Sequence, residues 1–334
     1  MNLKTNIGNE MSSKVAKLQS LVDKTSFWKG AALILFGIII LTQLFEVSIA
    51  PKIPFLNQSK TLSNNQVKSA QQSEEGATVA IDTLALTKSV LPAEGVALPI
   101  KWGDLGKRMV ADGVIDEGKF RALFEGGLGQ TEEQMMSGNS DQPVVMNEQN
   151  SRYLLDMLWA FGLANKNDIL DKGEMVDEKY GGAENFASTG GWSLAKGAGF
   201  DHYSMHEYVS LSPEEQKLVD TVSRGIYRPC CGNSTHFPDC NHGMAMLGLL
   251  ELMAKNGVSE KEMYDVALKV NSFWFPQTYI DLATYFEEQG QDWDQVDAKT
   301  ALSAQYSSSQ GYQQTRQNIK SLPKPASGNG GCGA

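Results

Sequence analysis

The sequence has no surplus of positive charge, which sets it apart from typical nucleic-acid-binding proteins. Its 29 lysines and arginines are outnumbered by 39 aspartates and glutamates, and the formal net charge is −10. A basic face that could follow a phosphate backbone is therefore not expected, and we predict no nucleic-acid partner. Cysteine is also scarce, since four residues in 334 are too few for a disulfide-rich scaffold. A hydrophobic content of 41% is sufficient for one or two globular domains.

Several motifs that mark catalytic or cofactor-binding loops are absent as well. The sequence contains no Gly-x-Ser-x-Gly elbow, no Gly-Lys-Ser/Thr phosphate loop and no Cys-x-x-Cys-His haem attachment sequence. Asp112 and Asp116 invite comparison with a calcium loop, but the alternating oxygen ligands and the distal glutamate are missing. We therefore expect no nucleophilic serine, no phosphate loop, no c-type haem and no calcium loop. Whether the protein is an enzyme stays open at this point.

The longest apolar segment lies near the N-terminus. Residues 30–45 carry no charge, and as a helix they would span about 24 Å, slightly less than a hydrocarbon core of about 30 Å. Five lysines precede this run, against only Glu10 and Asp23. This bias predicts a cytoplasmic segment at residues 1–29, a signal anchor across the lipid bilayer at residues 30–50, and an extracytoplasmic remainder. A cleaved signal peptide ending near Ala50 is the alternative.

The rest of the chain divides by composition. Residues 51–97 are polar, small and poor in aromatic side chains, which predicts a disordered spacer. Residues 98–306 show helical periodicity without convincing strand alternation, which predicts a compact α-helical domain. Residues 307–334 are rich in serine, glutamine and glycine, which predicts a flexible tail that carries Cys332. The predicted fold class is therefore mainly α, with one N-terminal transmembrane helix.

Two helices of this domain have wide apolar surfaces. Residues 148–164 present a broad apolar face, and residues 242–256 are apolar on nearly every side, as in the central helix of a core. Asp239 or Asn241 is expected to cap the second of these helices. Ser212 and Glu215 form the pattern of a capping box for a further helix that ends near residue 225. Residues 171–200 form a long glycine-rich loop, which we expect to pack against the cysteine-containing segment.

The segment of residues 227–257 gathers most of the residues that can bind a soft metal. Thiolate and imidazole ligands together favour zinc, copper or an iron–sulfur centre. A further histidine pair at spacing i, i+4 would lie on one face of a helix and can share a metal. We therefore predict metal ligands among Cys230, Cys231, Cys240, His236, His242, His202 and His206.

Two other interpretations of the cysteines remain open, because their spacing matches no familiar zinc-ribbon or ferredoxin pattern. In the first, the protein exchanges thiols and disulfides: Cys240, at a helix N-terminus, is the nucleophile of low pKa, Cys230 or Cys231 resolves the intermediate, and Cys332 relays it. In the second, a disulfide such as Cys231–Cys240 only stabilises an interaction module.

The sequence favours a membrane-anchored, extracytoplasmic protein that binds a soft metal. Cys332, on its glycine-rich arm, is expected to carry the metal to or from the site. The partners expected are the lipid bilayer, through residues 30–50, and a protein that donates metal or exchanges electrons.

Overall fold

The computed structural model describes residues 81–323. The predicted cytoplasmic segment, the anchor at residues 30–50, most of the spacer and Cys332 lie outside these residues. Within the described range, no helix combines the length and the apolar character that crossing a membrane requires.

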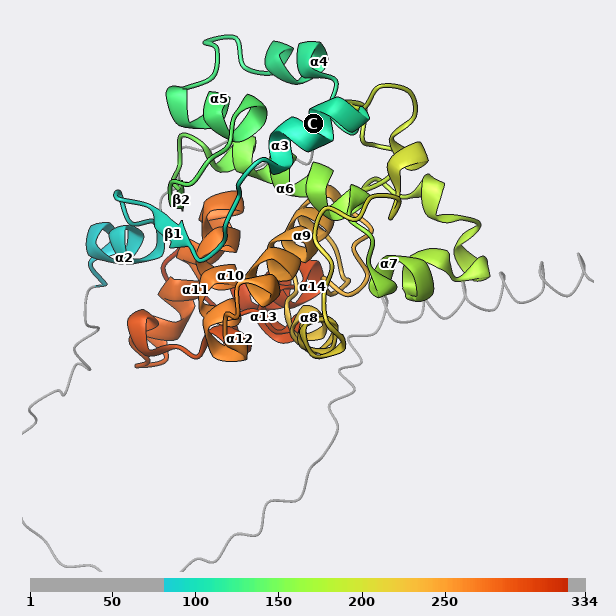
Figure 1. Cartoon of the computed structure of the whole chain (residues 1–334). Coiled ribbons are helices and arrows are strands. Elements are labelled where there is room, and N and C mark those ends of the chain that lie inside the picture. Colours follow the sequence, from blue (N-terminus) through green and yellow to red (C-terminus); the bar gives the residue numbers. More distant parts are fainter. Residues whose placement is uncertain (1–80, 324–334) are drawn as a thin grey trace, which may run out of the picture. The chain divides into compact units, whose positions relative to one another are not determined.

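Helices make up most of the described chain, so the prediction of a mainly α domain is confirmed (Figure 1). The body of the domain consists of the longer helices α6 (Ser151–Ala164), α8 (Pro213–Gly225), α9 (Asn241–Lys255), α10 (Glu260–Trp274) and α11 (Pro276–Glu288). Shorter helices surround them: α2 (Thr83–Val90), α3 (Leu105–Asp112), α4 (Glu117–Ala122), α5 (Gln130–Ser137), α7 (Asp168–Lys172), α12 (Ala298–Ala301), α13 (Ala304–Ser307) and α14 (Ser309–Arg316). The remaining elements are the strands β1 (Val96–Leu98) and β2 (Val144–Met146) and the 3-10 turns η1 (Glu174–Val176), η2 (Glu178–Tyr180), η3 (Ala183–Asn185), η4 (Gly199–His202) and η5 (Trp293–Gln295).

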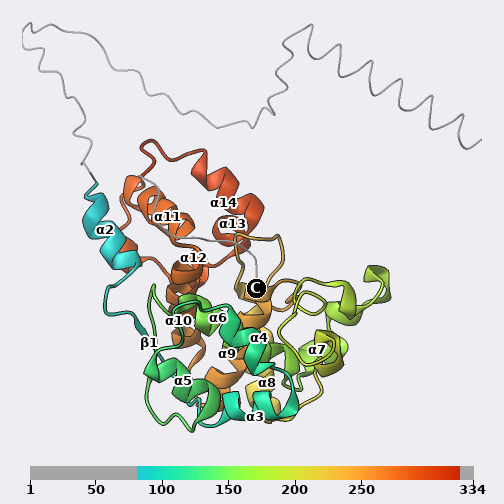
Figure 2. The ribbon, with the colours of Figure 1, turned by 90° about the horizontal axis from the view of Figure 1, so that it is seen from above.

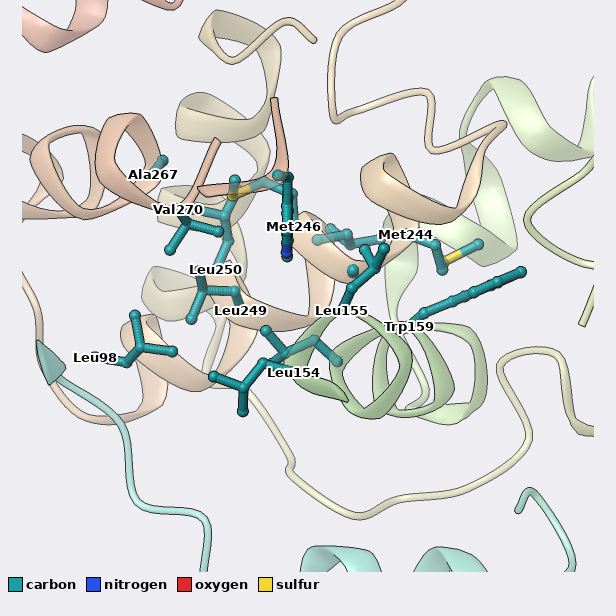
Figure 3. Close-up of a cluster of buried hydrophobic side chains, with 14 of the residues drawn as sticks. Leu98, Leu154, Leu155, Trp159, Met244, Met246, Leu249, Leu250, Ala267 and Val270 are labelled. Carbon is teal, nitrogen blue, oxygen red and sulfur yellow. The ribbon is translucent and has the colours of Figure 1, made fainter. Parts of the chain in front are cut away.

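The core is organised around the packing of α9 against α6. Every residue of α9 from Asn241 to Ala254 is buried, as the apolar sequence predicts. The two helices cross at a pair of glycines: a Cβ placed on Gly248 would lie 2.8 Å from the carbonyl oxygen of Leu158 and 3.0 Å from the Cα of Gly162. Leucine and methionine side chains fill the space beside this crossing (Figure 3). Because the backbones touch directly, the position of α9 is fixed tightly relative to α6.

The folded domain begins earlier than its composition predicts. Residues 81–97, which we expected to belong to the spacer, form α2 and β1. Leu86 and Val90 of α2 are buried, and α2 packs on α11 (Figure 2). Strand β1 pairs antiparallel with β2. Such a short helix has little stability of its own, so its order comes from these tertiary contacts, which composition does not reveal.

The folded domain also ends later than predicted, since α14 occupies the first part of the expected tail. The carboxylate of Asp281 in α11 is fully buried and holds α14 in place. It accepts hydrogen bonds from Nε of Arg316 at 2.9 Å and from the hydroxyl of Tyr312 at 2.8 Å. Glutamine- and serine-rich composition suggested flexibility, but one buried carboxylate provides a specific anchor.

Local signals for the helices around the cysteine segment are largely confirmed. Ser212 and Glu215 form the predicted capping box, with reciprocal hydrogen bonds of 3.2 and 2.7 Å. The predicted cap of α9 is wrong, because Cys240, and neither Asp239 nor Asn241, is its N-cap residue, with no hydrogen bond from the cap side chain. Oδ1 of Asn241, the first residue of the helix, accepts the N–H of His242 at 2.9 Å. The glycine-rich loop contacts the cysteine segment as expected, because the N–H of Ser188 donates to the carbonyl of Asp239 at 3.1 Å.

Candidate metal centre

Three cysteine side chains converge at the N-terminus of α9. Cys230 and Cys231 lie in the loop between α8 and α9, and Cys240 begins α9 itself. Their three sulfur atoms all lie within 4.8 Å of one another, and each residue is partly buried. Around one tetrahedral ion with metal–sulfur bonds of about 2.3 Å, neighbouring sulfurs are about 3.8 Å apart. The three cysteines can therefore hold a metal ion.

The sulfur geometry also bears on the disulfide interpretation. The sulfurs of Cys230 and Cys240 are 3.5 Å apart, far longer than an S–S bond of about 2.05 Å. Cys231 and Cys240 are thiols in this structure, so the disulfide considered between them is not formed. The loop does not depend on a covalent link for its shape.

Hydrogen bonds from several elements hold the cysteine loop instead. The N–H of Tyr227 donates to the carbonyl of Leu302 at 2.8 Å, and the N–H of Thr235 donates to Ile226 at 2.8 Å. The first residue of α14 binds the loop directly, since the N–H of Ser309 donates to the carbonyl of Cys231 at 2.9 Å. The C-terminal helix is therefore part of the support of the site.

A buried arginine lies beside the sulfurs. Arg228 is only 1% exposed, and its Nε donates a hydrogen bond to the sulfur of Cys240 at 3.0 Å. Its terminal nitrogens donate to the carbonyls of Asn233 and Phe237, each at 3.1 Å, and to the carboxylate of Asp239 at 2.7 Å. The guanidinium thus ties both ends of the cysteine loop together and places a positive charge next to the thiols.

This environment shifts the pKa values of Cys231 and Cys240 in opposite directions. Hydrogen bonds from Cys230 and Cys231, with the charge of Arg228 and a contact from His242, hold the pKa of Cys240 well below its ordinary value despite burial. For Cys231, the hydrogen bond to Cys230 lowers the pKa, but the bond to Cys240 and burial outweigh it and raise the pKa to about 11. Of Cys231 and Cys240, Cys240 is therefore the thiol with the lower pKa, in agreement with its position at a helix N-terminus.

His242 follows Cys240 by two residues in the chain. It belongs to the first turn of α9, is 4% exposed and hydrogen-bonds Cys240. Its ring packs against Phe275, with ring centres 4.4 Å apart, and against the edge of Trp274 at 5.6 Å. The sequence grouped His242 with the cysteines, but among the described residues the ligand atoms within 4.8 Å of one another are those of the three cysteines, without His242.

His236 is directed elsewhere. Its Nδ1 lies 2.7 Å from Oε2 of Glu174, and its Nε2 lies 2.9 Å from Oδ1 of Asp220. The ring lines a polar cleft of about 730 Å³ beside α7 and α8. Both ring nitrogens are engaged by carboxylates, so the prediction of His236 as a ligand beside the cysteines is not supported by this geometry.

His202 and His206 pair with each other rather than with the cysteines. Their Nδ1 and Nε2 atoms are 3.1 Å apart, and Nδ1 of His206 lies 3.6 Å from a carboxylate oxygen of Asp112. The expectation of a shared helix face is wrong, because the turn η4 ends at His202 and Ser204 adopts a positive φ of 54°. A turn, not a helix, brings the two rings together.

Two contributors to the centre were not predicted from the sequence. Arg228 is the residue two positions before Cys230, and a cation so close to clustered cysteines is a signal that was available. Asp239 was considered only as a helix cap, whereas its carboxylate accepts from Arg228 at 2.7 Å and from Asn233 at 2.8 Å.

Comparisons of the chain with protein-family models, with curated proteins and with solved structures gave no match. We therefore infer function from the chemistry of the centre itself.

Proposed function

We propose that this domain binds one soft or borderline metal ion through Cys230, Cys231 and Cys240. The observation that carries the proposal is the convergence of three sulfurs, from a loop and a helix N-terminus, within 4.8 Å. Thiolates are the ligands that zinc and copper(I) prefer. The support of the loop by several elements and by a buried arginine gives such a centre the rigidity that metal binding needs.

A single ion fits better than an iron–sulfur cluster. In a cubane cluster each cysteine binds a different iron, so the ligand sulfurs lie farther apart than they do around one ion. The separation of 3.5 Å between Cys230 and Cys240 is close to the value for one ion. Of the metals that the sequence suggested, zinc and copper are therefore favoured.

The charge of the surroundings is consistent with bound thiolates. Three thiolates with Asp239 carry four negative charges, of which Arg228 offsets one. Burying the negative charges that Arg228 does not offset is unfavourable without a further cation. A metal ion supplies the missing positive charge, which explains why three cysteines can be gathered beside a carboxylate.

The wider proposal includes the segments that the sequence places around the domain. The anchor at residues 30–50 would hold the domain outside the cytoplasm, and the lysine bias supports this orientation. Cys332, on a glycine-rich arm, would exchange the metal with the centre or with a partner protein. In this view the protein receives a soft metal at the outer membrane surface and passes it on.

Thiol–disulfide exchange is the second candidate, and one observation favours it. Cys240 has a depressed pKa and lies 3.5 Å from the sulfur of Cys230, which is the arrangement of a nucleophile beside a resolving thiol. In that case Cys240 would attack a substrate disulfide and expel one substrate thiolate. Cys230 would then attack the sulfur of Cys240 in the mixed disulfide, which releases the second substrate thiolate and leaves a Cys230–Cys240 disulfide, so the substrate is reduced as the two cysteines are oxidised.

Elemental analysis of the full chain, purified anaerobically in detergent without added metal, tests the proposal. We expect about one equivalent of zinc or copper, reduced severalfold in Cys240→Ser and in Cys231→Ser. Cys332→Ser is the matched control and should keep the metal. A metal-free protein whose three thiols oxidise reversibly would contradict metal binding and support thiol exchange.

A further inference from the structure

We propose that the polar cleft beside α7 and α8 binds a small zwitterionic ligand, either an amino acid or a short peptide with free ends. Lys217 would bind the carboxylate of this ligand, and Glu207 would bind its ammonium group. The proposal goes beyond metal binding and does not depend on it. It rests on the size of the cleft, on the pairing of the charges in its walls and on the rigidity of those walls.

The cleft has the size of a small-molecule site. Its volume is about 730 Å³, within the range of about 300–1,000 Å³ that is typical of such sites. Its walls come from residues 166–173, from residues 207–213 and from one face of α8, with His236 beside them. Because these segments meet only in the folded domain, the cleft brings side chains of different segments to the same space.

Most of the basic side chains in the walls already have partners of opposite charge. Three of them pair with carboxylates at 2.9 Å: Lys166 with Asp171, Lys172 with Asp168, and Arg224 with Asp220. The pair in α8 has two hydrogen bonds, from Nε at 3.1 Å and from a terminal nitrogen at 2.9 Å. These charges therefore compensate one another without a ligand.

Two charges in the walls have no such partner. Lys217 in α8 and Glu207 in the preceding segment both line the cleft, and neither forms an ion pair among residues 81–323. One cation and one anion on two segments of the same cleft are complementary to a ligand that carries one charge of each sign. Both side chains are exposed, so water solvates them and each contact adds modest affinity while it selects for charge.

The same walls argue against other classes of ligand. A phosphate group is bound best by several cations, whereas Lys217 is the only lysine or arginine of the walls that lacks a carboxylate partner among the described residues. A nucleobase or another flat ring packs best on an aromatic side chain, and the lining contains no phenylalanine, tyrosine or tryptophan. A small ligand of mixed charge is the best match.

Two buried polar side chains make part of the walls rigid. Asn167 is 2% exposed, and its Oδ1 accepts hydrogen bonds from the N–H of Ile169 at 2.8 Å and from Nε2 of Gln216 at 3.0 Å. His236 is 5% exposed and has carboxylates against both ring nitrogens. A site whose walls are held in place before the ligand arrives loses little conformational freedom on binding.

The cleft shares His236 with the loop of the three cysteines. His236 lies between Cys231 and Cys240 in the sequence, and its backbone N–H donates to the carbonyl of Ser223 in α8 at 3.1 Å. A ligand that fills the cleft would therefore touch the loop that carries the thiols. Lys217 and Glu207 lie outside that loop, so the cleft can be tested without changing the thiols.

Calorimetric titration of the full chain, purified in detergent and kept at low salt, tests the proposal with three probes. The probes are trialanine, its N-acetylated and C-amidated form, and alanine. We expect trialanine or alanine to bind saturably, and we expect the blocked peptide, which has no charge, to bind at least about 10-fold more weakly. The length of the zwitterion that binds more tightly then distinguishes a peptide site from an amino-acid site.

Two variants test the assigned side chains. Lys217→Met and Glu207→Gln should each weaken the binding of the preferred zwitterion about 5- to 10-fold, because each removes one of the two unpaired charges. Lys107→Met and Glu214→Gln change exposed charges that do not line the cleft, and both should bind as the wild type does. Circular dichroism checks that each variant keeps the fold.

Three results would overturn the proposal. In the first, neither trialanine nor alanine binds saturably up to about 10 mM. In the second, the blocked peptide binds as tightly as the free one. In the third, folded Lys217→Met and Glu207→Gln leave binding unchanged. Should either variant lose the fold, Lys217→Gln or Glu207→Ala takes its place, with the same expected loss and the same contrary result.

Discussion

The Nε atom of Arg228 donates a hydrogen bond to the sulfur of Cys240 at 3.0 Å, inside a pocket that leaves the guanidinium 1% exposed. Arginine, unlike lysine, can bind a sulfur, two carbonyls and a carboxylate with one rigid planar group. The pairing therefore shapes the loop and also stabilises a thiolate.

Replacing this arginine tests both roles. Arg228→Met should shift the pH midpoint of Cys240 alkylation upward in metal-free protein, because the positive charge that favours the thiolate is lost. It should also destabilise the domain by about 3–5 kcal/mol, since Asp239 loses its buried partner. Mass-spectrometric mapping of iodoacetamide modification and urea unfolding measure the two effects. Arg224→Met, at a side chain 53% exposed, is the control.

Gly243 makes room for Arg228 against the first turn of α9. A Cβ at this position would overlap the guanidinium. Gly243→Ala should therefore displace Arg228 and destabilise the domain by about 1–3 kcal/mol, with a loss of bound metal. Gly232→Ala lies in the same loop, where a Cβ would meet no atom within 4 Å, and should have little effect. Equal metal content and equal thermal stability in both variants would argue against the packing role of Gly243.

Glu251 gives the fold a pH dependence that can be measured. It is fully buried in α9, and burial raises its pKa to about 8. An acid with a raised pKa in the folded state contributes stability below its unfolded pKa near 4.5, and this contribution is lost as pH rises toward 8. The slope is about 1.4 kcal/mol per pH unit in that window. Urea unfolding across this range should show a flatter profile for Glu251→Gln, whereas Glu214→Gln, which is exposed, should follow the wild type.

Asp281 anchors the last helix and, through it, the cysteine loop. Asp281→Ala removes the acceptor for Arg316 and Tyr312 and should lower the free energy of unfolding by about 3 kcal/mol. Asp265→Ala breaks only an exposed pair with Lys261 and should lower it by less than about 1 kcal/mol. Chemical denaturation of both variants makes the comparison. If both variants lost a similar amount of unfolding free energy, the contacts of Asp281 with α14 would stabilise the domain no more than a surface ion pair does.

The predicted membrane topology needs a test of its own, because residues 1–80 lie outside the described range. The lysines before residue 30 predict an N-terminus in the cytoplasm and a C-terminus outside. A reporter fused after Ala334 that works only when exported should therefore be active. A second reporter that works only in the cytoplasm should be inactive at the same position. The reverse pattern would contradict both the anchor orientation and the extracytoplasmic location.

Much of the helical framework could be predicted because its signals are local. The box of Ser212 and Glu215, and the all-round apolar character of α9, depend on residues within a few positions of one another. The thiol cluster was also predictable, since Cys230 and Cys231 share a short loop with Cys240. Spacing alone limits how far apart these three can lie.

Features that depend on distant partners could not be predicted in this way. Asn165, directly after α6, donates a hydrogen bond to the carboxylate of Glu251 in α9 at 2.5 Å, and nothing near Asn165 in the sequence points to a partner 86 positions later. The sequence grouped His236 with the cysteines, but proximity in a loop does not fix the direction of a side chain. Its direction is decided by Glu174 and Asp220, which come from two other segments.

The first and the last helix of the described domain, α2 and α14, both pack on helix α11. A force applied to the two ends of the described domain would therefore act first on α11. At the C-terminal end, the force would meet Arg316 on Asp281 before it reached Ser309, whose N–H holds Cys231. A force applied at these two ends would therefore act on α11 and on the pair of Arg316 with Asp281 before it acted on the loop that holds the three thiols.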